Sequence, residues 1–293
     1  MNILLNSDHY QVTLNTRGAE LKSFRNPAGT EFIWNSDPAH WARSSPLLFP
    51  TIGNVRGNKT VIDGVEYEMP KHGFCKDSEF SVLAQSDDAV TFSLLASEQT
   101  RQSYPYDFEL RLSYRLCANR LSMTYQVHNK DARTMYYHIG AHPGFLCPLA
   151  DGESFTDYVL SFEQEERLEA TVYDLENLCF SSTRKRLFAE KAKVLPLTVE
   201  MFDEDAVFFP QIRSRMVQLL NPTTGNGIAM RYPGFSSIAF WTPAGGEAPF
   251  ICFEPWNGSA IYDDDSDIFS EKRGILSLDA GQNASYELEI TLL

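Results

Sequence analysis

Residues 108–127 read Phe-Glu-Leu-Arg-Leu-Ser-Tyr-Arg-Leu-Cys-Ala-Asn-Arg-Leu-Ser-Met-Thr-Tyr-Gln-Val, and they give the clearest evidence for the kind of fold. Large apolar side chains occupy every second position from Phe108 to Leu116. After a break at residues 118–120, the alternation resumes from Leu121 to Val127. A period of two is typical of strands that bury one face. The stretch therefore predicts an antiparallel hairpin with its turn at residues 118–120.

Alternating segments of the same kind recur along the chain, around residues 65–69, 158–162, 217–219, 228–232 and 286–292. Helical signals are confined to a short helix that could start at Asp37-Pro38 and to a turn or two at residues 97–104. Strands that alternate with long helices are absent, which argues against a parallel α/β fold. No linker rich in Pro, Gly or Ser divides the chain. We predict an all-β protein, a large antiparallel β-sandwich, with residues 1–293 as a single domain.

Composition and charge restrict the classes of partner. The chain carries 39 acidic and 25 basic residues, for a net charge of −14, and such a surface repels nucleic acid and anionic membranes. No segment approaches the ~18 apolar residues of a membrane span, and the first residues are too polar for a secretion signal. The five cysteines include no Cys-x-x-Cys pair. We expect a soluble cytoplasmic protein with a small-molecule partner and neither nucleic acid nor membrane.

Two segments that do not alternate carry proton-transfer residues beside proline, glycine and aromatic residues. His142 lies in Gly-Ala-His-Pro-Gly-Phe at 140–145, and Glu254 lies in Phe-Glu-Pro-Trp-Asn-Gly at 253–258. A histidine and a carboxylate suit a reaction in which one proton leaves an oxygen and another arrives at a different one. The ordinary alternatives are a buried histidine and a structural salt bridge. Glu254 follows the apolar run 250–253, where a carboxylate is costly unless it is paired or used.

Other chemistry has weak support. His138 and His142 have a helical metal-site spacing, but Gly140 and Pro143 argue against a helix, so we expect no metal site. Phosphate-binding and dinucleotide-binding glycine loops are missing, and we expect no cofactor.

His72, in Pro-Lys-His-Gly-Phe at 70–74, is either a loop histidine bound to backbone or a second active-site histidine. Phe145 and Trp256 offer the flat apolar surfaces on which sugar rings stack.

Several short motifs occur in a fixed order over nearly the whole chain, at residues 18–23, 31–34, 45–50, 71–74, 140–145, 240–242 and 254–258. Taken together, they make the sequence resemble the aldose 1-epimerase (galactose mutarotase-like) family, and most closely its LacX-like branch. The resemblance implies a β-supersandwich and an isomerase, a mutarotase that interconverts the α and β anomers of a free aldohexose in carbohydrate metabolism. It also implies that neither a metal nor an organic cofactor is required.

The resemblance assigns roles to individual residues. Glu254 matches the general base, His142 the general acid, and His72 a second active-site histidine. Arg56 matches a sugar-binding arginine. Asp205 matches an aspartate that contacts sugar hydroxyls, with Asp203 as the alternative. The reaction needs the anomeric hydroxyl deprotonated and the ring oxygen protonated, which suggests a carboxylate and an imidazolium on opposite sides of the C1–O5 unit.

Two other functions remain open. One is an epimerase for hexose 6-phosphates, which needs a phosphate pocket of arginine or lysine. The other is a non-catalytic sugar-binding or sensing protein, which has no need of an acid–base pair. Four cations lie near the motifs: Arg43, Arg56, Lys71 and Lys76. The net charge of −14 repels a dianion and no dense arginine cluster lies beside the motifs, so we predict a free neutral aldohexose over its 6-phosphate, with Arg56 alone at the site. The preference should reverse if two or more of the four cations line one rim within reach of a C6 phosphate.

Overall fold

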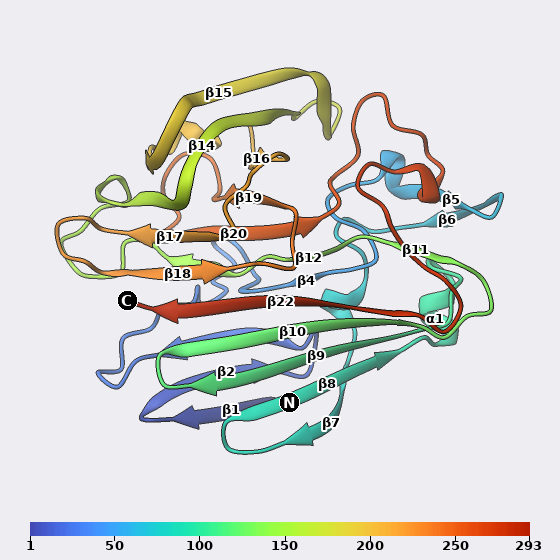
Figure 1. Cartoon of the computed structure of the whole chain (residues 1–293), viewed down its shortest axis with the longest axis horizontal. Helices are drawn as coiled ribbons and strands as arrows, with labels where there is room; N and C mark the ends of the chain where they lie inside the picture. The colour runs from blue at the N-terminus through green and yellow to red at the C-terminus, as the bar shows by residue number, and fades with distance from the viewer.

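The computed structural model of the chain describes all residues from Met1 to Leu293. It contains 22 β-strands, one short helix, α1 (Glu98–Arg101), and five single 3₁₀ turns (Figure 1). The predicted all-β class is therefore confirmed. The strands of the main sheet pair antiparallel with their neighbours, which confirms the predicted strand direction as well.

The hairpin expected at residues 108–127 consists of β9 (Phe108–Cys117) and β10 (Arg120–Asn129). Its register runs from Cys117 opposite Arg120 to Phe108 opposite Asn129. Alternate residues of β10 are buried, as the period of two predicts. On the other side of β10 lies the C-terminal strand β22 (Asn283–Leu292), so the centre of the sheet joins the middle of the chain to its end (Figure 1).

One sheet of 15 strands crosses the whole molecule. Its order is β4 (Leu47–Leu48), β12 (Ile139–Ala141), β20 (Phe250–Asn257), β19 (Ser237–Trp241), β16 (Val207–Phe209), β14 (Val159–Asp174), β17 (Met216–Leu220), β18 (Gly227–Arg231), β22, β10, β9, β8 (Ala89–Leu95) and β7 (Ser81–Gln85). Two more strands pair off this path, β13 (Gly144–Leu146) with β20 and β15 (Cys179–Pro196) with β14. A second sheet holds β1 (Asn2–Ser7), β2 (Tyr10–Asn15) and β3 (Glu20–Arg25). Two ribbons complete the fold: β5 (Lys59–Ile62) with β6 (Val65–Glu68), and β11 (Met135–Tyr137) with β21 (Leu276–Leu278).

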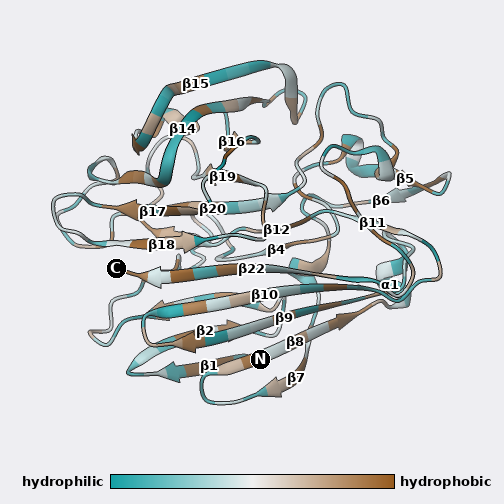
Figure 2. Ribbon diagram, viewed as in Figure 1, coloured by the Kyte–Doolittle hydropathy of each residue, from teal (hydrophilic) through white to brown (hydrophobic).

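The apolar faces of these sheets form one large core. A continuous cluster of 62 buried residues extends from Ile3 to Leu292. The hydropathy of the strands changes from residue to residue along β9, β10 and β22 (Figure 2), as expected where one face is buried and the other is wet. The N-terminal sheet is tied to this layer by the buried hydroxyl of Tyr114, which donates a hydrogen bond to the Ala19 carbonyl at 2.7 Å.

Strand β20 differs from this pattern, because all eight of its residues are buried. Ile251 and Phe253 point into the large core. Cys252 and Trp256 belong to two smaller apolar clusters on the other face. Glu254 lies between them on that second face, since residues two apart in a strand point the same way. The main core therefore ends at β20, and a separate site begins on its other side.

The two helical signals have different outcomes. The expected turn at residues 97–104 is the helix α1, and it begins with a capping box in which Ser97 and Thr100 each bond the other's backbone N–H. The expected helix from Asp37 to Trp41 is wrong, because only a single turn forms there. The chain leaves that turn because Trp34 Nε1 donates to the Trp41 carbonyl at 2.8 Å. None of the helices is long and apolar enough to cross a membrane.

The long loop after β20 contains a buried lysine. Lys272 is 3% exposed, and the nearby carboxylates of Asp265 and Asp267 pair with Arg273 and Arg56 instead of with it. Burial lowers the pKa of Lys272 to about 8. An unfolded lysine keeps its proton to roughly pH 10.4, so the unfolded state binds more protons between these two values. Folding stability attributable to Lys272 therefore rises with pH across that window.

We predict that Lys272→Met increases the free energy of unfolding at pH 7 by about 1–3 kcal/mol, because an apolar side chain has no charge to desolvate. The gain should shrink at pH 9 to 10, where Lys272 is neutral in the folded protein. Urea unfolding at both pH values measures this, with the exposed Lys193→Met as the control. A Lys272→Met variant that is less stable than wild type at pH 7 would contradict the prediction.

Candidate active site

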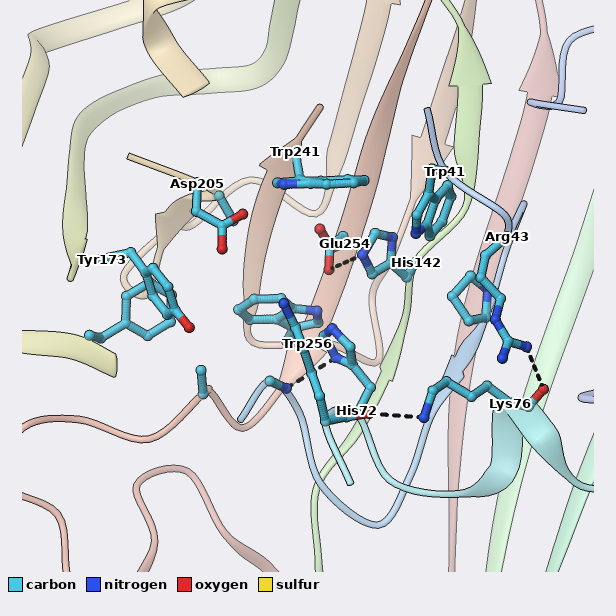
Figure 3. A pocket seen from close by; sticks show the side chains of 16 residues that line it. Trp41, Arg43, His72, Lys76, His142, Tyr173, Asp205, Trp241, Glu254 and Trp256 are labelled. Carbon is cyan, nitrogen blue, oxygen red and sulfur yellow. Dashed lines mark hydrogen bonds and ion pairs between the residues drawn. The ribbon is translucent and has the colours of Figure 1, made fainter. Parts of the chain in front are cut away.

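A pocket of about 300 Å³ lies against the second face of β20. Glu254 and Trp256 come from β20, His142 follows β12, and Trp241 ends β19 (Figure 3). Loops and the tip of the β14–β15 hairpin supply the rest of the lining. The volume is at the lower end of the range for small-molecule sites, and the mixed aromatic and charged lining is typical of them.

The structure brings His142 and Glu254 together across 112 positions of sequence. His142 Nε2 lies 3.1 Å from Glu254 Oε2, and both side chains are almost fully buried. The two groups are therefore in direct contact with each other, whereas the sequence suggested that they lie on opposite sides of the C1–O5 unit. Burial lowers the pKa of His142 to about 3. Burial, reinforced by the nearby Asp205, raises the pKa of Glu254 well above its usual range.

His72 lies beside this pair. Its ring centroid is 5.6 Å from that of His142, with the rings nearly perpendicular. Nδ1 accepts a hydrogen bond of 3.1 Å from the Gly53 backbone N–H, which leaves the proton on Nε2. The ring is thus bound to backbone, which is one of the two alternatives for His72, and it also lines the pocket. A role as a second active-site histidine stays a prediction. Burial and the charges of His142 and Lys71 lower the pKa of His72.

The backbone at His72 adopts a conformation that few residues accept. His72 has φ 64° and Gly73 has φ 70°. A Cβ atom on Gly73 would lie 2.1 Å from the carbonyl oxygen of Phe49, so the chain passes closely over the end of β4. This close approach holds the His72 ring at the pocket wall.

We predict that Gly73→Ala destabilises the protein by at least about 2 kcal/mol, because the added Cβ has both a strained φ and a backbone clash. Gly64→Ala is the matched control, since Gly64 also has a positive φ (78°) but nothing lies within 4 Å of the added Cβ. Urea unfolding of both variants separates the two contributions. Equal losses of stability would show that the contact with Phe49 does not matter.

Aromatic rings enclose the acid–base pair. Trp41 stacks on His142 with centroids 4.9 Å apart, and Trp241 meets the same ring edge-on at 5.8 Å. Tyr173 and Phe180, which face each other near the tip of the β14–β15 hairpin, line the opposite part of the pocket. Figure 3 shows His142 and Glu254 among the rings of Trp41, Trp241 and Trp256. Such flat surfaces suit a ligand with apolar C–H faces, such as a sugar ring.

Three buried polar atoms of the site have no hydrogen-bond partner within the protein: His142 Nδ1, Glu254 Oε2 and Trp256 Nε1. Buried donors and acceptors are almost always paired in folded proteins. Unpaired ones in a pocket wall indicate groups that a ligand or solvent satisfies. No group of three or more His, Cys, Asp or Glu side chains is placed to hold a metal ion.

Two predicted site residues lie elsewhere. Phe145 is fully buried and stacks edge-on with Phe253 in the main core, so its proposed contact with a sugar is wrong. The reason is the register: Phe145 pairs with Ile251, on the face of β20 that points away from Glu254. Arg56 is also outside the pocket. Its guanidinium donates to Asp267 Oδ1 at 2.6 Å and to the carbonyls of residues 262, 263 and 265, which fixes the loop after β20.

The choice between the two aspartates is clear in the structure. Asp205 lines the pocket, whereas Asp203 is exposed and does not. Asp205 follows a 3₁₀ turn at Val199–Phe202 and has φ 71°, and its carboxylate points toward the pocket interior (Figure 3). The left-handed conformation at Asp205 turns the chain so that residues 203 and 205 do not share a side.

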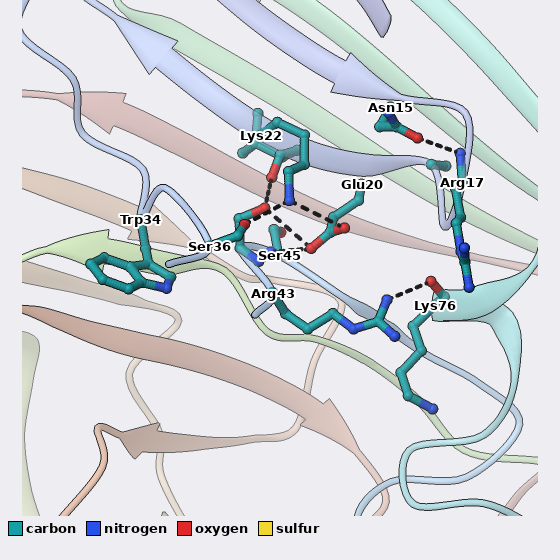
Figure 4. A network of polar contacts seen from close by, with 12 residues as sticks. Asn15, Arg17, Glu20, Lys22, Trp34, Ser36, Arg43, Ser45 and Lys76 are labelled. Carbon is teal, nitrogen blue, oxygen red and sulfur yellow. Dashed lines mark hydrogen bonds and ion pairs between the residues drawn. The ribbon is translucent and has the colours of Figure 1, made fainter. Parts of the chain in front are cut away.

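Three of the four candidate cations line the pocket: Arg43, Lys71 and Lys76. Arg43 donates to the Lys76 carbonyl at 2.9 Å and pairs with Asp77 (Figure 4). Lys76 Nζ donates to the Lys71 carbonyl at 2.9 Å and to the Gly73 carbonyl. The segment that carries Arg43 is anchored by buried Glu20, whose Oε1 accepts from the backbone N–H groups of Ser44 and Ser45.

Some residues of the pocket were not expected from the sequence: Trp41, Tyr173, Phe180 and Trp241. Trp241 had a usable signal, because it belongs to one of the ordered motifs and pairs with Cys252 on the Glu254 face. Trp41 lies in the misassigned helix. Tyr173 and Phe180 resemble any other aromatic residue of an alternating strand, and only the path of the hairpin brings them to the site.

Comparison with known proteins agrees with this geometry. The sequence model of the aldose 1-epimerase family matches residues 1–287, so the chain belongs to that family. It is 31% identical to the plasmid-encoded protein LacX of Lactococcus lactis subsp. lactis, over 99% of both chains. The fold is similar to that of a galactose mutarotase related enzyme from Lactobacillus acidophilus, with a TM-score of 0.92 and 26% identity over 100% of this chain and 97% of that one.

A more distant similarity is confined to part of the chain. A putative glucose-6-phosphate 1-epimerase of Escherichia coli K12 is 24% identical over 148 residues, which cover 45% of this chain and 47% of that protein. The expected family and fold are thus confirmed, and the chain has relatives whose names refer to more than one kind of sugar substrate.

Proposed function

We propose that this protein is an aldose 1-epimerase that interconverts the α and β anomers of an aldohexose by acid–base ring opening and closure. The observation that carries the proposal is the 3.1 Å contact between His142 Nε2 and Glu254 Oε2 within an aromatic pocket. We also infer that residues 1–293 act as a single domain, because one apolar core extends from Ile3 to Leu292.

The chemistry fits two adjacent proton-transfer groups. The anomeric hydroxyl and the ring oxygen are bonded to the same carbon, so a donor and an acceptor that touch each other can serve both. Glu254 takes the proton from the hydroxyl, and His142 gives a proton to the ring oxygen. The C1–C2 bond then rotates and the ring closes on the other face. Asp205 and the Nε2–H of His72 are placed to hold hydroxyl groups during this rotation.

The two groups share one proton between them. Burial favours the uncharged form of each, so the pair holds one proton as carboxylic acid and neutral imidazole, or as carboxylate and imidazolium. These two states differ only by the position of a proton along the contact. Ring opening leaves Glu254 protonated and His142 neutral. In ring closure Glu254 returns its proton to the anomeric oxygen and His142 takes the proton back from the O5 hydroxyl, so each turnover restores the pair through the sugar.

We predict that Glu254→Gln and His142→Asn each lower kcat/KM for mutarotation by on the order of 100-fold or more. The double variant should lose little more than either single one, because the two residues serve one proton transfer. Polarimetry with freshly dissolved α-glucose and α-galactose measures the rates. Glu247→Gln, at an exposed position outside the pocket, is the control for the loss of one carboxylate.

A wild-type protein that speeds no anomer interconversion, yet binds sugars, would indicate the non-catalytic binding protein instead. Near wild-type turnover by Glu254→Gln would remove that residue from the mechanism. Multiplying losses in the double variant would show that the two side chains do not act as a unit.

A second candidate is favoured by one observation: Arg43, Lys71 and Lys76 line the same pocket, whereas Arg56 does not. This lining supports a phosphorylated sugar, which needs two or more cations at one rim within reach of a C6 phosphate. In Figure 3, Arg43 and Lys76 lie on the opposite side of His142 from Asp205. The second candidate is therefore an epimerase for an aldohexose 6-phosphate, the substrate in the name of the distant relative.

We expect this substrate to be preferred over the neutral sugar that the net charge of −14 suggested, because nearby cations outweigh remote surface charge. Steady-state comparison of glucose, galactose and glucose 6-phosphate decides the matter. A kcat/KM for the phosphate at least ~10-fold above both free sugars, about 1.4 kcal/mol of transition-state preference, is the expected result. Equal or higher values for a free sugar would restore the neutral substrate.

A further inference from the structure

Of the three cations in the pocket, only Lys71 has no partner within the chain. Arg43 and Lys76 are both bound to Asp77 and to backbone carbonyl groups. The ammonium group of Lys71 forms neither a hydrogen bond nor a salt bridge with any protein atom, and its side chain is exposed at the pocket. The charge of Lys71 is therefore not offset by an ion pair, whereas Arg43 and Lys76 share the one negative charge of Asp77.

The groups around Lys71 are the acid–base residues of the site. Lys71 precedes His72 in the chain and lines the same pocket as His142 and Glu254. Burial is the main cause of the pKa shifts of these three residues, and the positive charge of Lys71 acts on each of them in the direction that lowers the pKa. The titratable groups that face Glu254 are His142 at 3.1 Å, Asp205 across the pocket, Cys252 on the same face of β20, and Lys71. Asp205 and burial both favour the protonated carboxyl group of Glu254. The charge of Lys71 acts against them.

We propose that Lys71 is a positioning residue for the reaction, and that its unpaired ammonium group sets the pH range over which the His142–Glu254 pair holds the single proton needed for catalysis. A nearby positive charge disfavours each protonation of the pair. Loss of Lys71 would therefore make the pair bind both its first and its second proton at higher pH. The catalytic role of Lys71 rests on the proposed function. The effect of Lys71 on the protonation of His142 and Glu254 does not depend on that function.

The kinetic test compares the pH dependence of kcat/KM for Lys71→Met, Lys71→Arg and wild type. We expect both limbs of the Lys71→Met profile to move to higher pH, with a loss on the order of tenfold on the acidic limb that disappears as the pH rises. Lys71→Arg keeps the charge and should retain the wild-type profile. Lys193→Met, at an exposed lysine without an ion pair and outside the pocket, controls for the change in net charge. An unmoved profile for Lys71→Met, at any level of activity, overturns the proposal.

The same variants separate this role from that of a phosphate ligand. A residue that acts on Glu254 affects glucose and glucose 6-phosphate alike. If Lys71→Met lowers kcat/KM only for glucose 6-phosphate and leaves the pH profile for glucose unchanged, Lys71 binds the anionic substituent and the proposal fails.

A direct readout needs no turnover. Carbon-13 NMR of the Glu254 side-chain carboxyl group, assigned by its absence in Glu254→Gln, reports its protonation in the substrate-free protein. The proposal expects the titration midpoint to lie at higher pH in Lys71→Met than in wild type. An equal midpoint contradicts it. If the wild-type protein acts on no sugar, the proposed function fails, but this measurement still decides whether Lys71 controls the proton on the pair.

Discussion

Burial of strand β20 on both faces is the constraint on which the rest of the site depends. Its odd-numbered residues Ile251 and Phe253 fill the main core, and its even-numbered residues Glu254 and Trp256 face the pocket. A slip of one residue would exchange the two sets and place a carboxylate in the core. The register with β12, β13 and β19 is therefore specified by the hydrophobic effect on one face and by the cost of burying a charge on the other.

The same burial determines the electrostatics. Strands supply the acid–base pair, with Glu254 in β20 and His142 just after β12, where desolvation disfavours both charged forms. Loops supply the compensating charge, and they do so unequally, because Asp77 and peptide carbonyls neutralise Arg43 and Lys76 but not Lys71. The sheet thus holds Glu254 and positions His142, and the cations of the pocket lie on loops.

Much of this could be predicted from the sequence. The alternation in residues 108–127 predicted the hairpin of β9 and β10, and the ordered motifs predicted the family and brought His142, His72 and Glu254 into one hypothesis. The errors have specific physical causes. Phe145 is an aromatic residue of the kind that stacks on sugars, but it lies opposite Ile251 and shares its core-facing side of the sheet. The sequence of one strand does not show which of its residues will pair with the core-facing residues of the next strand. Arg56 forms an ion pair with Asp267, which is 211 positions away in sequence and lies in the loop after β20.

What the sequence by itself determined is the all-β class, the family and the residues able to move a proton, because periodicity, motif order and side-chain chemistry are local properties. Only the tertiary structure decided that Asp205 rather than Asp203 faces the pocket, that Trp41 stacks on His142, and that Lys71 alone among the pocket's cations is unpaired. Each of these depends on contacts between segments that are remote in sequence. Contacts of this kind depend on the register between strands and on the packing of loops. Neither can be read from the order of residues along the chain.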